Sequence, residues 1–196
     1  MGKLLWKPSE KRIKQANMTK FIEFVNKKYG LKINSYVQLY NWSIKNIPDF
    51  WAAMWEFEGI KASRRYDEVV DDLSKFPGAR WFIGARLNFA ENLLRHRDNH
   101  VAFIFRGETQ KSARMTYAEV YNTVARLAKS LRKIGVAPGD RVCAYMPNLM
   151  ETAIAMLAAT SIGATWASCG AELGTQAALD RLGQIEPKVL FTADGY

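Results

Sequence analysis

Cysteine is scarce in this sequence, with two residues in 196, and this scarcity limits the sites that the chain can hold. Neither Cys143 nor Cys169 belongs to a Cys-X-X-Cys pair or lies at a zinc-ligand spacing from a histidine. The only histidines, His96 and His100, have Asp98 between them in a loop-forming stretch, so we interpret both as surface residues. We therefore predict no metal site, and two buried free thiols in a reducing compartment.

Long hydrophobic runs are also missing. The longest apolar stretch, residues 153–162, is too short to cross a bilayer. The N-terminal residues do not combine a positive segment with an apolar one, as a secretory signal does. We expect a soluble cytoplasmic protein without a membrane partner.

The familiar catalytic and phosphate-binding motifs are absent as well. The sequence contains no GxGxxG, no GxxxxGK[ST] and no GxSxG. The acidic pairs at 67–68 and 71–72 could be acid–base carboxylates, but nothing in the sequence fixes them on one face, so a solvated loop is the favoured interpretation. We predict no catalytic residue in this chain.

Positive charge is abundant and unevenly placed. The net charge is +9, with +7 in residues 1–50, +5 in residues 101–150 and −3 in residues 151–196. A basic surface can bind nucleic acid. Because no nucleic-acid motif accompanies the charge, we favour a solvated face, or a fragment separated from an acidic partner half, and expect no nucleic-acid partner.

The last third of the chain has the pattern of a parallel sheet. Short apolar runs at 142–146, 165–167 and 189–191 alternate with two helix-length segments, which predicts a βαβαβ unit. In such sheets ligands bind at the carboxyl ends of the strands. We therefore expect any chemistry just after Met146, Ala167 or Phe191.

The residues before this unit predict helices and a hairpin. Ser9, Asn17 or Thr19, Ser35 and Pro48 mark helix starts, and residues 101–105 and 111–115 predict a β-hairpin. Thr116 with Glu119 forms a capping box, and Asn148 is predicted to cap the next helix. Tyr36, Leu39, Tyr40 and Ser43 lie at helical spacing. Two apolar helix faces are predicted: one with Phe50, Trp51, Met54 and Trp55, and one with Tyr117, Val120, Val124, Leu127, Leu131 and Ile134. The predicted class is α/β, with a helical cap in residues 1–100 and the hairpin and parallel unit in 101–196.

The loop after the second parallel strand is the one candidate binding element. Gly170 and Gly174 flank Ala171-Glu172-Leu173, and a helix is predicted to begin near Thr175. A helix N-terminus at this edge could meet an anionic or amide-bearing ligand. A plain strand-to-helix turn is the alternative interpretation.

Several motifs resemble adenylate-forming acid–CoA ligases. They are Thr116-Tyr-Ala-Glu-Val, Gly135-Val-Ala-Pro-Gly-Asp-Arg-Val, Met146-Pro-Asn and Ile162-Gly-Ala-Thr-Trp-Ala. Two upstream segments resemble the N-terminal cap of the acetyl-CoA and acetoacetyl-CoA synthetase branch: Phe50-Trp-Ala-Ala-Met-Trp-Glu-Phe, and Trp81-Phe-Ile-Gly-Ala-Arg-Leu-Asn-Phe-Ala-Glu-Asn-Leu-Leu. Three further segments are more similar to the acetoacetyl-CoA synthetase family: Ser168-Cys-Gly-Ala-Glu-Leu-Gly, Leu179-Asp-Arg and Ile185-Glu-Pro-Lys. The resemblance covers nearly the whole chain.

The resemblance implies the first part of an acyl-CoA synthetase fold and an ATP-dependent ligase. In such an enzyme acetoacetate would attack the α-phosphate of ATP with Mg²⁺ present, and CoA would then displace AMP. The loop that meets the adenine end of CoA falls on Gly170, Ala171 and Glu172, although the relatives have a glycine pair where this chain has Ala171-Glu172.

The family's phosphate loop, adenine segment, ribose-binding aspartate and catalytic lysine have no counterpart here, so the resemblance implies an N-terminal fragment. We expect it to be inactive alone and to bind ATP, Mg²⁺ and CoA at most weakly. An acetyl- or propionyl-CoA synthetase fragment and a non-catalytic binding module of the same fold remain alternatives. The oligomeric state stays open.

Overall fold

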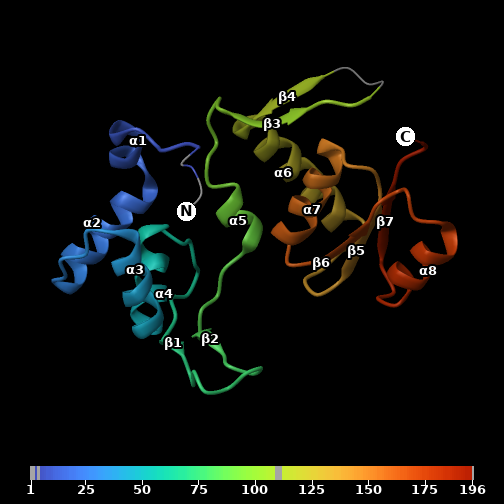
Figure 1. The fold of residues 1–196 in the computed structure, drawn as a ribbon. Helices are drawn as coiled ribbons and strands as arrows, with labels where there is room; N and C mark the ends of the chain where they lie inside the picture. Colours follow the sequence, from blue (N-terminus) through green and yellow to red (C-terminus); the bar gives the residue numbers. More distant parts are fainter. Residues whose placement is uncertain (1–2, 4, 109–111, 196) are drawn as a thin grey trace. The chain divides into compact units, whose positions relative to one another are not determined.

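The computed structural model describes residues 3, 5–108 and 112–195. The chain divides into two compact units, Met1–Arg86 and Leu87–Tyr196, whose elements are labelled in Figure 1. This border lies before the one predicted between residues 100 and 101. The division into a helical cap in residues 1–100 and a hairpin with a parallel unit in residues 101–196 stays a prediction.

The first unit begins with helices and ends with a short antiparallel strand pair. The elements are α1 (Glu10–Gln15), α2 (Asn17–Tyr29), α3 (Tyr36–Lys45), α4 (Ile47–Phe57), β1 (Glu68–Val70) and β2 (Trp81–Ile83). Ser9 and Ser35 cap α1 and α3 through their side chains, as predicted, and Gly30 ends α2 in the left-handed conformation. The strand β2 was not predicted from the sequence.

The core of the first unit is aromatic, but its membership differs from the prediction. Phe21, Val25, Leu39 and Ala53 are buried, and the Phe21 ring contacts Phe24, Phe50 and Phe57 edge-on or stacked. Of the α3 residues at helical spacing, Leu39 is buried, whereas Tyr36 and Tyr40 are exposed. Trp51 is 41% exposed, whereas the small Ala53 is fully buried. Ala53 is buried in one cluster with Phe21, Val25 and Leu39, and helical spacing alone does not show which side of α4 faces inward.

The second unit carries the predicted hairpin, the long helix and the parallel sheet. Its elements are α5 (Phe89–Leu93), β3 (Val101–Phe105), β4 (Ala113–Thr116), α6 (Tyr117–Lys133), β5 (Arg141–Tyr145), α7 (Met150–Ser161), β6 (Thr165–Cys169), α8 (Thr175–Gly183) and β7 (Val189–Thr192). β3 and β4 pair antiparallel, as predicted, although part of the predicted returning strand, Lys111, lies outside the described residues. The capping box is present, with Thr116 Oγ1 accepting from the Glu119 amide and Glu119 accepting from the Thr116 amide.

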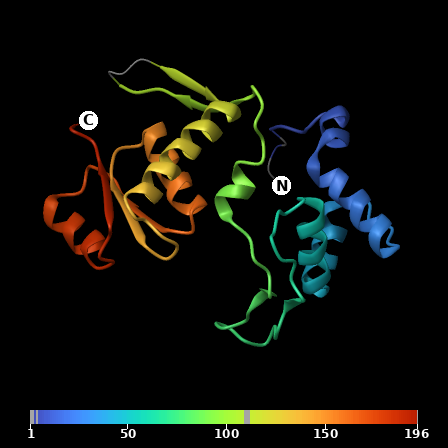
Figure 2. The same ribbon diagram turned by 180° about the vertical axis from the view of Figure 1, so that it is seen from behind.

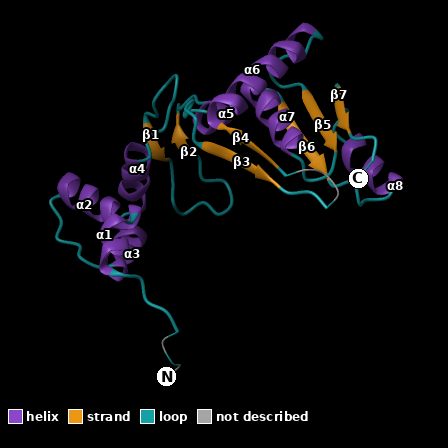
Figure 3. Ribbon diagram, turned by 90° about the horizontal axis from the view of Figure 1, so that it is seen from above, coloured by secondary structure: helices purple, strands orange, loops and turns teal. Residues whose placement is uncertain are grey.

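The sheet of the second unit has the strand order β6-β5-β7, and both strand pairs are parallel. The predicted βαβαβ unit is confirmed. The chain goes from β5 outward to β6 and then returns past β5 to β7. Helices α6 and α7 lie on one face of this sheet and α8 lies on the other (Figures 1 and 2). Figure 3 shows the three strands between these helices from above.

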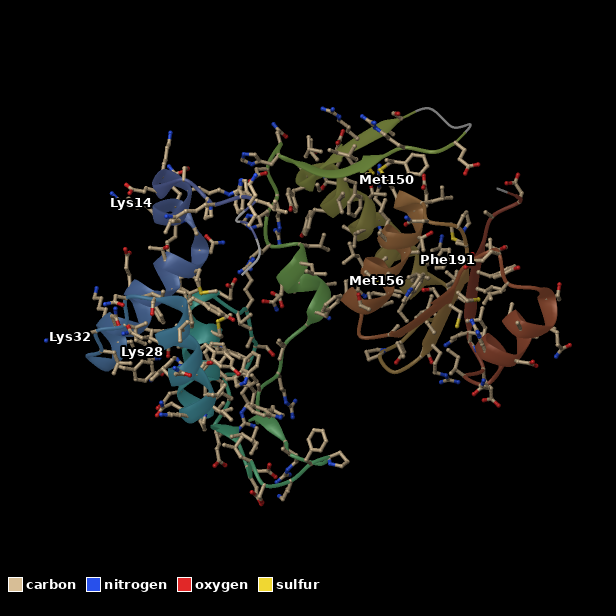
Figure 4. The ribbon with its side chains drawn as sticks, viewed as in Figure 1. Lys14, Lys28, Lys32, Met150, Met156 and Phe191 are labelled. Carbon is tan, nitrogen blue, oxygen red and sulfur yellow. The ribbon has the colours of Figure 1, made fainter. Side chains whose placement is uncertain are left out.

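The two faces of β5 belong to different packing layers. Val142 is buried in a hydrophobic cluster that also contains side chains of α6 and α7. Its register partners Trp166 and Val189 pack against the same cluster. Met156 of α7 and Phe191 of β7, labelled in Figure 4, also pack against it. Because side chains alternate along a strand, Cys143 and Tyr145 belong to the α8 face.

Two predictions for the second unit were wrong. Asn148 does not cap α7; the N-cap position is Leu149, and no side chain of the described residues caps the helix. Ile134 was predicted on the buried face of α6 but is 62% exposed, while Ala128 is buried instead. Ile134 stands at the C-cap of α6, where the backbone leaves helical geometry and the helical spacing no longer applies.

Candidate functional site

The carboxyl edge of the parallel sheet is the candidate site. β5 ends at Tyr145, β6 at Cys169 and β7 at Thr192, and Tyr145 is in register with both of the other two residues. The connection from β5 goes to one neighbour and the following connection returns to the other side. This reversal is a topological switch point, where open α/β sheets leave a crevice for ligands.

The predicted ligand loop lies at this edge, as a turn between β6 and α8. The Leu173 amide donates to the Gly170 carbonyl at 3.3 Å, and Gly174 is the N-cap residue of α8. No side chain caps this helix among the described residues. The structure thus places Gly170, Ala171 and Glu172 together at the end of β6, immediately before a helix N-terminus.

The side chain of Glu172 folds back over Gly170. A Cβ atom built on Gly170 would lie 2.1 Å from Glu172 Oε2, far inside van der Waals contact. The φ angle of Gly170 lies outside the left-handed region, so the glycine is required here by space and not by backbone conformation. Any larger residue at position 170 would require the exposed Glu172 side chain to move.

Tyr145 holds this loop to the central strand. Its hydroxyl donates to the Ala171 carbonyl at 3.0 Å and is also hydrogen-bonded to the Leu173 carbonyl. The sequence reasoning did not find this residue. The one available signal was its position, because a tyrosine at the carboxyl end of a central strand places a polar hydroxyl at the ligand edge.

Cys143 and Cys169 are free thiols, as predicted, but only Cys143 is buried and Cys169 is partly exposed. Burial raises the pKa of the Cys143 thiol, and the nearby Cys169 adds a smaller effect in the same direction. The Cys143 side chain is therefore held in its protonated, weakly nucleophilic form at neutral pH.

The histidines and the acidic pairs belong to other segments of the chain than this edge. His100 contacts Asp98 at 3.0 Å, and both His96 and His100 are exposed. Asp71 and Asp72 lie in a loop, where Asp71 binds Arg80 and Lys75, so their carboxylates do not form a pair aimed at one substrate atom. Within residues 3, 5–108 and 112–195 no group of three or more His, Cys, Asp and Glu side chains could hold a metal ion. None of the helices in that same part of the chain is long and apolar enough to span a membrane.

Comparison with known proteins identifies relatives along nearly the whole chain. Acetoacetyl-CoA synthetase of Xenopus tropicalis is 41% identical over 98% of this chain, and malonamoyl-CoA synthetase vrtB of Penicillium aethiopicum is 40% identical over 96%. The solved structure of acetoacetyl-CoA synthetase from Streptomyces lividans covers the entire chain with a TM-score of 0.91 and 40% identity. The chain spans 29%, 27% and 31% of these three proteins, respectively.

Two family profiles match this sequence. The profile of the acetyl-coenzyme A synthetase N-terminus matches residues 36–93, which include α3 and α4. The profile of the AMP-binding enzymes matches residues 89–196, more than half of the chain, and this range contains the hairpin and the parallel sheet. The chain therefore belongs to the family of AMP-binding enzymes.

Proposed function

We propose that this chain is the N-terminal part of an ATP-dependent acid–CoA ligase that forms acetoacetyl-CoA from acetoacetate, ATP and CoA. The observation that carries the proposal is the 41% identity to an acetoacetyl-CoA synthetase over 98% of the chain. Identity at this level extends through both compact units, so it concerns more than the parallel sheet that many enzymes share.

The reaction proceeds in two steps. A carboxylate oxygen of the acid attacks the α-phosphate of ATP, pyrophosphate leaves, and an acyl-adenylate forms. The CoA thiol then attacks the acyl carbon and AMP leaves. The first step needs preorganised amides, a cationic side chain and a metal ion around the phosphates.

The residues of this chain do not fit the triphosphate or its Mg²⁺. The sequence has no glycine-rich loop that ends in lysine. The described residues offer no cluster of metal-ligating side chains. We therefore assign no step of adenylate formation to this chain, and expect the chain by itself to make no acyl-AMP.

The part of the site that this chain supplies is the loop of Gly170, Ala171 and Glu172, which meets the adenine end of CoA. Its position at the carboxyl edge, before the N-terminus of α8, supports this role. A turn that only connects β6 to α8 would occupy the same place, so CoA binding has to be tested directly.

The two relatives' names also narrow the class of acid. Acetoacetyl and malonamoyl groups both carry a carbonyl on the third carbon, one as a ketone and the other as an amide. Acetate and propionate lack this carbonyl. We infer that the acid is a short one with a carbonyl at that position.

We also infer that the ligase works in the cytoplasm, where Cys143 and Cys169 stay reduced.

The proposal is tested on the complete ligase that contains this chain. Pyrophosphate release is measured with ATP, CoA and one of four acids: acetoacetate, malonamate, acetate or propionate. The expected result is fastest release with acetoacetate. Faster release with acetate or propionate would move the assignment to the sibling synthetases, and no release with any acid would contradict the ligase proposal altogether.

A further inference from the structure

Tyr145 occupies a position from which one side chain can reach the ligand loop. It is the last residue of the central strand β5, in register with Cys169 on one side and Thr192 on the other. Its side chain belongs to the α8 face of the sheet, opposite the cluster that contains Val142. It therefore leaves the sheet at the carboxyl edge, on the side from which the loop enters α8.

The Tyr145 hydroxyl fixes the loop on both sides of Glu172. One phenolic proton is shared between the Ala171 carbonyl, at 3.0 Å, and the Leu173 carbonyl. The Gly170 carbonyl already accepts from the Leu173 amide. The carbonyls of Gly170, Ala171 and Leu173 are thus engaged within the protein, whereas the Glu172 side chain is exposed.

On the basis of the proposed function, we propose that Tyr145 is a positioning residue for CoA, which holds the loop so that the Glu172 carboxylate accepts from the exocyclic amine of the adenine. An adenine amine is a donor and needs an acceptor, and a carboxylate is an acceptor only. The same carboxylate repels phosphate groups, so it faces the base of CoA and not its phosphates.

The first test separates CoA binding from activation of the acid. In the complete ligase, Tyr145→Phe keeps the ring and removes the hydroxyl. The KM for CoA is expected to rise about tenfold, the loss expected for one to two hydrogen bonds. Acetoacetate-dependent exchange of pyrophosphate into ATP, which needs no CoA, should stay within about twofold of the unmodified enzyme. Tyr117→Phe, which removes a hydroxyl from the start of α6, should change neither quantity.

The second test concerns the Glu172 carboxylate. A CoA analogue with hypoxanthine in place of adenine has a carbonyl where CoA has the amine. The unmodified ligase should favour CoA over this analogue in kcat/KM. Glu172→Gln should reduce that preference at least about fivefold, because an amide can both donate and accept.

Each outcome decides between the proposals. A ligase that exchanges pyrophosphate but whose KM for CoA is unchanged in Tyr145→Phe overturns the positioning role alone. Equal losses of pyrophosphate exchange and of the reaction with CoA also overturn the positioning role, because they would show that the hydroxyl stabilises the whole unit. An unchanged base preference in Glu172→Gln overturns the contact with the adenine amine. Absence of pyrophosphate exchange in the unmodified ligase would instead overturn the proposed function, before any variant is made.

Discussion

The Lys188 ammonium lies 2.9 Å from the Asp140 carboxylate and joins the residue before β7 to the residue before β5. Lys188 also donates to the Gly135 carbonyl at 2.6 Å, and Asp140 accepts from the Ala137 amide at 2.8 Å. These bonds tie the turn that follows α6 to the sheet edge opposite the candidate site. Two hydrogen bonds hold the pKa of the Asp140 carboxyl below its usual range. The bond from the Ala137 amide has the larger effect, and the bond from Lys188 has the smaller one.

The Asp140–Lys188 pair should stabilise the second unit in a pH-dependent way. A carboxyl whose pKa is lower in the folded state stabilises that state above its unfolded pKa of about 4, and this stabilisation is lost as the pH falls through the folded value. Asp140→Asn should lower the melting temperature by a few degrees at pH 7, and the difference should vanish in acid. The measurement is thermal unfolding followed by circular dichroism between pH 7 and pH 2.5.

Asp194→Asn serves as the control for this pair, because Asp194 is an exposed carboxylate just beyond β7. Its melting temperature should match that of the unmodified chain at every pH. A difference for Asp140→Asn that is equally large at pH 7 and in acid would contradict the electrostatic explanation.

Leu131 and Ile134 were predicted on one face of α6, but they differ in burial, so truncating each should affect stability differently. Leu131 is 2% exposed, so Leu131→Ala should reduce the free energy of unfolding by about 2–5 kcal/mol, through lost apolar contact and the cavity left behind. Ile134→Ala, at the exposed end of the same helix, should change it by less than about 0.5 kcal/mol. Urea unfolding of both variants provides the comparison, and similar losses would show that Ile134 is buried in solution.

The capping box at the start of α6 should contribute measurably to stability. Thr116 Oγ1 accepts from the Glu119 amide at 3.2 Å, which satisfies one of the free amides of the first turn. Thr116→Ala should therefore cost about 1 kcal/mol in urea unfolding, and Thr116→Ser should retain most of the stability. A Thr116→Ser variant as unstable as Thr116→Ala would indicate that the methyl group, and not the cap, matters.

Tyr29 should make the first unit sensitive to alkali. Burial raises the pKa of Tyr29 to about 12, with smaller effects from the negative charges of Asp49 and Glu56. Its hydroxyl donates to the Asp49 carbonyl at 2.8 Å. Because the folded pKa is raised, the stabilisation is complete below the unfolded value of about 10 and is lost as the pH rises through 12.

Ultraviolet titration of tyrosinate should therefore show one group ionising near pH 12 that disappears in Tyr29→Phe. Tyr40→Phe removes an exposed tyrosine from α3 and should leave that late transition in place. Loss of the late transition in Tyr40→Phe, or its persistence in Tyr29→Phe, would assign it to another tyrosine.

Local signals in the sequence predicted much of the fold. Ser9, Ser35 and the Thr116–Glu119 box begin helices because their side chains satisfy amides only three residues away. The same reasoning wrongly predicted that Asn148 caps α7. The helix α7 begins two residues later, and packing of its apolar side chains against the sheet sets its start in place of a cap.

For the candidate site, the alternation of strands and helices located the loop between β6 and α8, and the family resemblance singled out Gly170, Ala171 and Glu172 in it, but neither identified Tyr145. The hydroxyl of Tyr145 meets carbonyls 26 and 28 residues later in the chain. No local pattern specifies a contact between residues so far apart, because it depends on the register of β5 and β6.

The sequence by itself determined most of the order of helices and strands, several of the helix caps and the parallel character of the last sheet, because each follows from residues within about one turn or one strand of another. Only the tertiary structure decided which face of α4 and α6 is buried, how the three strands are ordered and which side chain holds the loop between β6 and α8. These depend on packing between segments distant in the chain, where the free energy of burial outweighs the preferences of any single segment.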